Sequence, residues 1–352
     1  MSILNQITVV ILSRERQHCL SKVIPFWERH GVKTLILDQS TNPLGVEVLR
    51  QLNLGTYLHI NEPFRERCRK AQEMIDSKYS IVISDDELYV PSALKEMAEL
   101  LENDPELVAV GAMSMAIWKY GPRTCGHWAY RTTHNYENLA EQAIERIRKH
   151  TNNGNRAITS FLTSNLNRTE SLLDCLSLYS KSPYIVTEAA STLAICAAGK
   201  FKYVNNLYWI RNWNEPPRSN QGWDRKLMVH DWWHNRASLN KADYFEFEVE
   251  LRRIFAKYAK EQDFEIAWNL ILDSSRRSVG KEDLESSKSW LANKAIINYT
   301  KYLFKLFFSR STLPANVKET LNAMVNSGVE ICDSETREAI GIISGLYPYK
   351  NW

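Results

Sequence analysis

The stretch Tyr79-Ser80-Ile81-Val82-Ile83-Ser84-Asp85-Asp86-Glu87 joins a short apolar run to three consecutive acids. The β-branched run 79–83 predicts a buried strand, and the acids stand where that strand emerges. Adjacent carboxylates repel one another and are costly near a core unless a cation neutralises them. Mg²⁺ or Mn²⁺ takes carboxylate oxygens and shares its other positions with phosphates, so the stretch predicts a metal–diphosphate site. The alternative is a solvated acidic turn ahead of Pro91.

Similar apolar runs of strand length alternate with helical patterns in the first third of the chain. The expected strands are 7–12, 32–37, 57–60 and 107–113, and the expected helices are 17–30, 46–52, 65–75 and 91–101. Strands that are continuous apolar runs and alternate with helices indicate a parallel sheet covered on both faces. The predicted fold class is therefore α/β, with a doubly wound, mostly parallel sheet of the Rossmann-like kind, followed by a C-terminal helical region.

Three regions are expected from the change in pattern along the chain. Residues 1–115 form the doubly wound unit, and residues 116–238 form a looser region rich in aromatic side chains, with helices expected at 136–149 and 187–198. Residues 239–352 are mostly helical in pattern. No internal repeat and no low-complexity linker separates them.

Composition narrows the classes of protein that the chain can represent. The 44 basic and 41 acidic residues nearly balance, so the chain lacks the excess of positive charge that is typical of proteins that bind duplex nucleic acid. The six cysteines are scattered without metal spacing, which favours free thiols in a reducing compartment. No secretory signal or transmembrane run is visible. The sequence therefore predicts a cytoplasmic protein that does not bind nucleic acid.

Polar residues follow the expected strands of the first region. Ser13 and Arg16 leave the first strand and open a helix, whose free amides suit a phosphate or nucleotide edge. Asp38 ends the second strand, where a carboxylate can accept hydrogen bonds from a base or ribose, unless it only forms an Asx turn. Arg65 and Arg69 share one face of the helix before the acids, where they meet either a diphosphate or solvent.

The second half of the chain carries three more candidates. Glu188 precedes a small apolar stretch, which favours either general-base chemistry or a simple helix N-terminus. The segment 208–234 is rich in Trp and Arg, so its aromatic faces suit sugar rings or a plain aromatic core. Residues 289–308 carry lysines opposite apolar side chains, as expected for a helix on an anionic membrane or an ordinary amphipathic helix.

The order of these motifs resembles the nucleotide-sugar half of GT-A glycosyltransferases, especially the large family 2. The segment Val10-Ile11-Leu12-Ser13-Arg14-Glu15-Arg16 looks like that family's opening Val-Ile-Pro-Thr-Tyr-Asn-Arg, with Leu12, Arg14 and Glu15 as departures. Asp38 matches the acid that binds the nucleobase. The run 84–87 is similar to the Asp-x-Asp region. The resemblance covers roughly residues 1–235.

The resemblance implies a role for each of these residues. Asp85 would contact the ribose, Asp86 would hold Mn²⁺ or Mg²⁺ together with Glu87 and His230, and Glu188 would be the general base of an inverting transfer. The remaining candidates are the donor-binding residues Ser13, Arg16, Asp38, Arg65 and Arg69 and the acceptor-binding residues Trp209, Arg211 and Trp213.

The function expected from the resemblance is transfer of a sugar from a nucleotide-sugar donor to a hydroxyl of a glycan or lipid-linked acceptor, in surface polysaccharide synthesis. Residues 289–310 would then rest on the inner face of the membrane. Two alternatives stay open. The first is a sugar-phosphate nucleotidyltransferase, although its Gly-rich signature after the first strand is absent. The second is a non-catalytic carbohydrate- or protein-binding module on a degenerate transferase fold.

Overall fold

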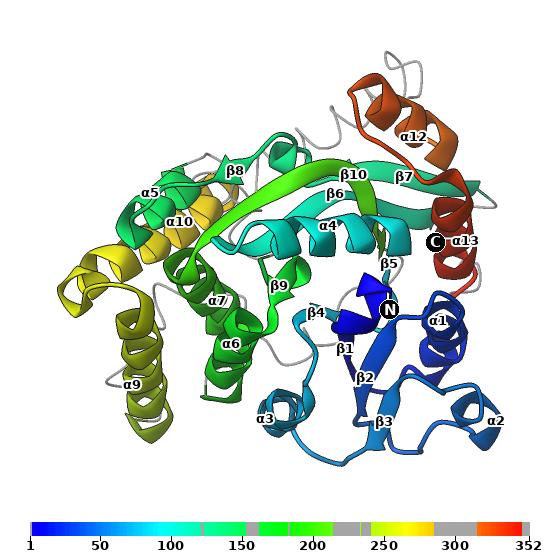
Figure 1. Ribbon diagram of the computed structural model, residues 1–352, viewed down its shortest axis with the longest axis horizontal. Coiled ribbons are helices and arrows are strands. Elements are labelled where there is room, and N and C mark those ends of the chain that lie inside the picture. Colours follow the sequence, from blue (N-terminus) through cyan, green and yellow to red (C-terminus); the bar gives the residue numbers. More distant parts are fainter. Residues whose placement is uncertain are drawn as a thin grey trace, which may run out of the picture.

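The computed structural model describes residues 2–120, 123–152, 162–181, 184–213, 233, 241–284 and 315–346. Within these ranges a ten-stranded sheet runs through the molecule in the order β3-β2-β1-β4-β9-β6-β10-β5, with β7 beside β6 and β8 beside β10 (Figure 1). The strands are β1 (Ile7–Ser13), β2 (Lys33–Asp38), β3 (Thr56–His59), β4 (Tyr79–Ile83), β5 (Leu88–Tyr89), β6 (Leu107–Tyr120), β7 (Arg123–Ala129), β8 (Glu137–Asn138), β9 (Leu166–Arg168) and β10 (Lys200–Asn212).

Eleven α-helices surround the sheet in the described ranges. They are α1 (Gln17–Arg29), α2 (Val46–Leu49), α3 (Phe64–Met74), α4 (Pro91–Asn103), α5 (Ala143–Asn152), α6 (Thr169–Lys181), α7 (Tyr184–Ala198), α9 (Lys241–Tyr258), α10 (Phe264–Leu284), α12 (Val317–Asn326) and α13 (Asp333–Ser344). Figure 1 shows α5, α6, α7, α9 and α10 gathered at one end of the sheet and α12 and α13 at the other. None of the described helices is long and apolar enough to cross a membrane.

The predicted fold class is confirmed. Strands β1 to β4 pair in parallel with one another, and β6 pairs in parallel with β10, while β5, β7, β8 and β9 pair antiparallel to their neighbours. The residues that the apolar runs predicted to be buried are buried: Ile7, Val9, Val10 and Ile11 of β1 are fully covered. All six cysteines are free thiols, and five of them are buried. The apolar runs therefore form the core of the sheet, as their burial on both faces requires.

The second region differs from its prediction in two places. The helix expected at 136–149 begins only at Ala143, because Glu137–Asn138 instead pairs with β10. Residues 200–212, where no strand was expected, form the long strand β10, which runs beside β6 with three register shifts. Strands β9 and β10 thus complete the same sheet as β1–β4, and α12 and α13 of the C-terminal region pack on β7 and β10.

The chain reverses direction across the sheet between β1 and β4. It leaves β1 for β2 and β3 on one side and returns to β4 on the other side of β1. The register pairs Ser13 with Asp38 and Ile11 with Ile83, so β1, β2 and β4 end at the same edge. In open α/β sheets, ligands bind in the crevice outside such a switch point, because the loops diverge there. The acids after β4 lie at this position.

Candidate functional site

Ser13 and Asp85 join the ends of β1 and β4. The hydroxyl of Ser13 donates a 2.7 Å hydrogen bond to Oδ2 of Asp85, and both side chains are buried. The turn after β4 is short, with the amide of Glu87 3.4 Å from the carbonyl of Ser84. The turn after β1 and the acidic cluster after β4 are therefore in direct contact.

Arg16 is the cation between the first two acids. Its Nη1 lies 2.9 Å from Oδ1 of Asp85 and 2.8 Å from Oδ2 of Asp86. The turn that presents Arg16 contains Glu15 at a φ of 55°, a left-handed conformation that is uncommon for a non-glycine residue. Glu15 is held there by bonds to the next turn: its amide donates to Oγ of Ser40 and its carboxylate accepts from Thr41.

Asp38 at the end of β2 is fully buried. Its Oδ1 accepts from the amide and the hydroxyl of Ser40 at 3.0 and 2.5 Å, and its Oδ2 accepts from the Tyr57 hydroxyl at 2.9 Å. Burial raises the pKa of Tyr57 to about 12, and the hydrogen bond to Asp38 acts in the same direction, while the amide of Leu44 opposes it. The bonds from Ser40 form an Asx turn, which was the simpler of the two interpretations of Asp38. The same bonds also hold the carboxylate in one orientation, so the geometry is compatible with a second role as a hydrogen-bond acceptor for a base or ribose.

The arginine that reaches the strand ends from α3 is Arg67, which the sequence prediction passed over. Its Nη1 donates to the carbonyl of Ser13 at 2.7 Å and to that of Leu37 at 3.3 Å, and its side chain is buried. Burial lowers the pKa of Arg67. The predicted Arg69 instead pairs with Glu66 and Glu73 on the exposed face, while Arg65 is half-buried at the start of the helix.

A sequence signal for Arg67 exists in hindsight. Arg67, Cys68 and Ala71 are the three buried residues of α3, and the last two mark its apolar face by their one-turn spacing. An arginine beside that face must find hydrogen-bond partners in the core, because a buried guanidinium is costly without them. Here two carbonyls at the ends of β1 and β2 are those partners.

Strand β10 supplies the partners of the other acids. The carboxylate of Glu87 accepts from Nε of Arg211 at 2.8 Å and from Nε1 of Trp209 at 2.9 Å. The Nδ2 of Asn212 donates to Oδ2 of Asp86 at 3.1 Å. These contacts span more than 120 positions of sequence, and Asn212 was not predicted as a site residue.

Aromatic rings stack beside these polar contacts. Trp209 is 3% exposed and stacks on Tyr89 and Tyr130 with ring centroids 5.7 and 5.8 Å apart. The guanidinium of Arg211 lies over Trp209 and Tyr130. Trp213 is 47% exposed and stacks on Trp118. Of the three predicted acceptor-binding residues, Trp213 alone has a widely exposed ring.

Burial governs the protonation of the acids. It raises the pKa of Asp85 to about 6, and the neighbouring charge of Asp86 adds to this, while Arg16 and Ser13 oppose it. Burial also raises the pKa of Glu87 against the opposing charge of Arg211. Burial therefore works against the charged forms of Asp85 and Glu87, and the contacts from Arg16, Ser13 and Arg211 oppose it.

These contacts decide how well the acids fit a divalent metal. Carboxylate oxygens are the right kind of ligand for Mn²⁺ or Mg²⁺. However, Arg16 and Asn212 both bind Oδ2 of Asp86, and Arg211 binds Glu87. The described ranges hold no group of three or more His, Cys, Asp or Glu side chains placed to bind an ion. In this arrangement the acids fit arginine as their cation, and a metal would have to displace Arg16.

Glu188 lies on α7 and is half-buried. Its charge acts on Tyr179, whose pKa is raised well above its usual range mainly by burial. The Tyr179 hydroxyl bonds Ser191 at 2.9 Å and Thr163 at 3.2 Å, so Glu188 borders a buried hydroxyl network. The role of Glu188 as a base stays a prediction. His230 and the segment 289–310 lie outside the described residues.

The fold and the site define a mixed α/β protein with charged residues gathered at the switch point of its sheet. No protein-family model matches the chain, and no curated protein matches it. Among solved structures, the chain is similar to residues 1–349 of TarS from S. aureus, with 9% identity and a TM-score of 0.42, over 80% of this chain and 92% of that one.

Two further solved structures resemble the chain. A crystal structure of TarS from S. aureus has 12% identity and a TM-score of 0.41, over 73% of this chain and 45% of that one. The mannosyltransferase PcManGT from Pyrobaculum calidifontis, in complex with GDP-Man and Mn²⁺, has 12% identity and a TM-score of 0.37, over 92% of this chain and 85% of that one.

Proposed function

We propose that the chain is a glycosyltransferase that moves a sugar from a nucleotide-sugar donor to a hydroxyl of a glycan or lipid-linked acceptor in surface polysaccharide synthesis. One observation carries the proposal. Ser13 and Arg16 after β1 meet Asp85 and Asp86 after β4 at the switch point of the sheet. This is the crevice in which open α/β sheets bind ligands, and its motifs follow the order that resembles family 2.

Donor binding is assigned to the ends of β1 and β2. In this proposal Asp38 accepts hydrogen bonds from the base or ribose, and its anchors Ser40 and Tyr57 hold the carboxylate in place. Asp85, which follows β4 on the other side of β1, takes the ribose. Because both carboxylates are buried and already oriented, they need little reorganisation to accept a donor's hydroxyl or amide groups.

The net charge of the acidic cluster affects how the diphosphate of a donor can bind. Three acids, Asp85, Asp86 and Glu87, face two arginines, Arg16 and Arg211, which leaves one negative charge in excess when all three are ionised. A diphosphate adds more negative charge, so a cation must turn toward it. Arg16 is the cation placed between the acids and the strand ends. The proposed reaction has no step through a metal, and the metal role of Asp86, Glu87 and His230 stays a prediction.

The proposed transfer step requires a base and a surface that binds the acceptor. A base, for which Glu188 is the candidate, takes the proton of the acceptor hydroxyl while its oxygen attacks the anomeric carbon. The bond from that carbon to the diphosphate oxygen breaks, and the nucleoside diphosphate leaves with the electron pair. Trp213, with its exposed ring, is the residue of the predicted acceptor wall best placed to stack on a sugar.

The test is a thermal-shift panel of UDP-, GDP-, ADP-, dTDP- and CMP-sugars and their free nucleotides, each with EDTA, Mg²⁺ or Mn²⁺. A ligand at about 100 times its Kd stabilises the folded state by about 2.7 kcal/mol. We expect one nucleotide series to raise the melting temperature of the wild type and of D76N but not of D38N. Asp76 is the matched control because its side chain is 74% exposed and pairs with Lys33.

The outcomes separate the candidate functions. A shift in EDTA shows that Arg16 suffices as the cation, whereas a shift that needs Mn²⁺ shows that the metal displaces it. No shift with any nucleotide, or an equal shift in D38N, contradicts the donor site and favours a binding module. Release of free sugar or transfer to an acceptor by the shifted nucleotide then distinguishes an enzyme from a nucleotide binder.

A further inference from the structure

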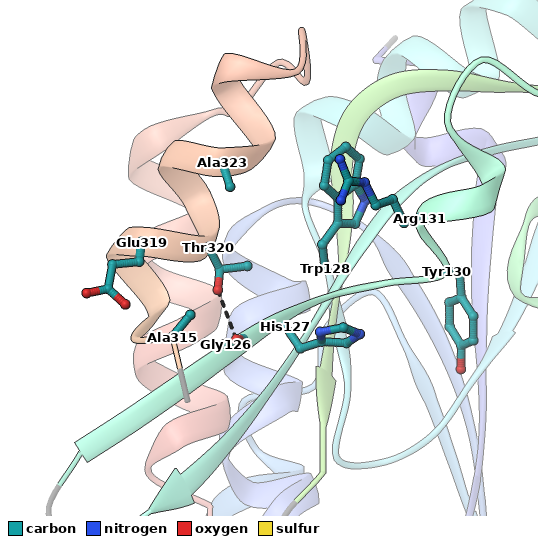
Figure 2. Close-up of a pocket in the computed structure, with 9 residues that line it drawn as sticks. All are labelled: Gly126, His127, Trp128, Tyr130, Arg131, Ala315, Glu319, Thr320 and Ala323. Atoms are coloured by element: carbon teal, nitrogen blue, oxygen red, sulfur yellow. Dashed lines mark hydrogen bonds between the residues drawn. The ribbon is translucent and has the colours of Figure 1, made fainter. Parts of the chain in front are cut away.

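A groove lies between strand β7 and helix α12, away from the ends of β1 and β2. Its volume is about 470 Å³, within the range of small-molecule sites. Figure 2 shows residues of the strand and the following turn on one side and residues of the helix on the other. The residues that line this β7–α12 groove are Gly126, His127, Trp128, Tyr130, Arg131, Ala315, Glu319, Thr320 and Ala323.

The groove is built by specific contacts between distant segments. The hydroxyl of Thr320 donates to the carbonyl of Gly126 at 2.9 Å, and the amide of Gly126 donates to the carbonyl of Ala315 at 3.0 Å (Figure 2 shows the first bond). A Cβ at Gly126 would lie only 3.2 Å from Cα of Val317, so glycine allows this close approach of the helix. A capping box between Asn316 and Glu319 begins α12 at the same place.

The two walls of the groove differ in chemistry. On the strand wall, the aromatic surface is that of Trp128, and the guanidinium of Arg131 lies 5.0 Å from its ring centre, while the rings of His127 and Tyr130 point away from α12 (Figure 2). The carboxylate of Glu319 is bound by the amide of Asn316 in the capping box. Among the described residues no carboxylate forms an ion pair with Arg131, which is exposed at the groove. The groove therefore offers aromatic surface next to a positive charge that an anion could meet.

Tyr130 connects the groove to the acidic cluster. Its backbone has a φ of 51°, an uncommon conformation for an aromatic residue. Its ring stacks on Trp209 and lies under the guanidinium of Arg211, which pairs with Glu87. On the same strand, the ring of His127 lies 5.5 Å from that of Trp213. A ligand in the groove would therefore border the residues that surround the proposed reaction centre.

We propose that the β7–α12 groove binds one sugar unit of the acceptor glycan, and that this sugar carries a phosphate or carboxylate group. The sugar lies between β7 and Ala323 of α12, and its anionic group pairs with Arg131, whose guanidinium lies 5.0 Å from the ring centre of Trp128. This inference rests on the proposed function, because it places the acceptor relative to the donor crevice. A phosphate and a carboxylate share the chemistry that Arg131 recognises.

The test uses a printed array of defined oligosaccharides in three sets: neutral, uronate-bearing and phosphate-bearing. We expect the wild type to bind members of an anionic set above their neutral counterparts. R131Q should lose at least about tenfold in affinity, as expected for one hydrogen-bonded ion contact. A323W should lose binding by filling the groove, since Ala323 lines it and is exposed. The matched control V325W changes an exposed residue of the same helix outside the groove and should bind like the wild type.

A second measurement keeps the two proposals separate. The nucleotide-induced rise in melting temperature is recorded for each variant, and it should equal that of the wild type because no substitution touches the strand ends. Glycan binding unchanged in R131Q and A323W, or binding of no anionic glycan, overturns the groove proposal even when nucleotides bind. Glycan binding that depends on Arg131 without any nucleotide effect supports the groove and contradicts the transferase. Competition by inorganic phosphate, but not by a neutral sugar, identifies the anion as the main contact.

Discussion

The guanidinium of Arg16 lies 2.8 Å from Oδ2 of Asp86. The same nitrogen, Nη1, also lies 2.9 Å from Asp85, so one cation bridges two adjacent acids. Both carboxylates are more than nine-tenths buried, and the arginine is 12% exposed. Arg16 therefore stands where a divalent ion bridging these acids would stand. A divalent ion bound by both carboxylates would therefore have to displace this arginine.

Replacing Arg16 should create affinity for Mn²⁺. In R16Q the two carboxylates lose their cation in a region of low dielectric, so a divalent ion in its place is strongly favoured. We expect Mn²⁺ titrations followed by electron paramagnetic resonance, without nucleotide, to show at least about tenfold tighter binding than in the wild type. R69Q should match the wild type, because Arg69 pairs with Glu66 and Glu73 at the surface. Equal Mn²⁺ binding in R16Q and the wild type, or binding retained in R16Q/D86N, would show that Arg16 does not occupy a metal site.

Replacing Arg67 should destabilise the fold. R67M keeps most of the side-chain volume but leaves the carbonyls of Ser13 and Leu37 without this donor, at a cost of about 2 to 3 kcal/mol. R69M on the same helix removes only exposed ion pairs and should cost less than about 1 kcal/mol. Urea unfolding of both variants measures the difference. Similar free energies of unfolding for the two would contradict a bridging role for Arg67.

Two glycines should respond to alanine in opposite directions. A Cβ at Gly111 of β6 would lie 2.4 Å from the ring of Tyr203 and 2.5 Å from Oδ1 of Asn165, so G111A should destabilise by about 1 to 3 kcal/mol. A Cβ at Gly341, in the exposed interior of α13, would meet nothing within 4 Å. G341A should therefore stabilise by about 0.5 to 1 kcal/mol. Thermal unfolding of the pair checks both signs, and a destabilised G341A would show that α13 does not have this geometry.

Glu250 should make the stability depend on acid pH. Its hydrogen bonds from Arg253, together with that from Ser177, lower its pKa to about 2 against the opposing effect of burial. A lowered pKa means that the stabilisation is present above the unfolded pKa near 4.5 and is lost as the pH falls toward 2. The wild type should exceed E250Q by about 1 to 2 kcal/mol at pH 6, a value reduced for the exposure of Arg253.

The measurement for Glu250 is urea unfolding between pH 6 and pH 2.5. The difference between the wild type and E250Q should shrink steadily with falling pH. E246Q, an exposed position on the same helix, serves as the control and should show no such trend. A constant difference at all pH values would mean that the carboxylate of Glu250 is not held ionised by these contacts.

Glu188 should matter for transfer and not for donor binding. A general base contributes about 10²- to 10⁴-fold, so E188Q should lose that much of the transfer rate and keep the nucleotide-induced thermal shift. E170Q is a matched control, because the Glu170 side chain is 72% exposed. Rates of sugar transfer with the nucleotide sugar that shifts the wild type provide the readout. An active E188Q would place the base elsewhere.

Local patterns predicted the first four strands and their helices because each element is specified by residues close in sequence. The apolar run 79–83 forms β4, and Gly31 adopts a φ of 68° just after α1, a conformation that glycine allows at the end of a helix. Pro91 begins α4 at the first helical position. The meeting of Ser13, Asp38 and the acids follows from parallel strands whose carboxyl ends share one edge.

Contacts between distant segments could not be predicted in the same way. The short β8, the long β10 and the pairing of Arg211 with Glu87 depend on how residues more than a hundred positions apart pack together. Aromatic and asparagine residues in 200–212 gave no regular alternation, because register shifts and stacking interactions replace it. The choice of Arg67 over Arg69 likewise depended on which side of α3 faces the sheet.

By itself, the sequence determined an α/β sheet whose first strands end in Ser13, Asp38 and three acids, because apolar periodicity and turn residues act over short distances. Only the tertiary structure decided that arginines neutralise those acids. It also decided that Trp209 is buried, and that α12 closes a groove on β7. The physical reason is that side-chain partners and burial are properties of the packed whole, where the low dielectric makes each unpaired charge costly and selects the partner that neutralises it.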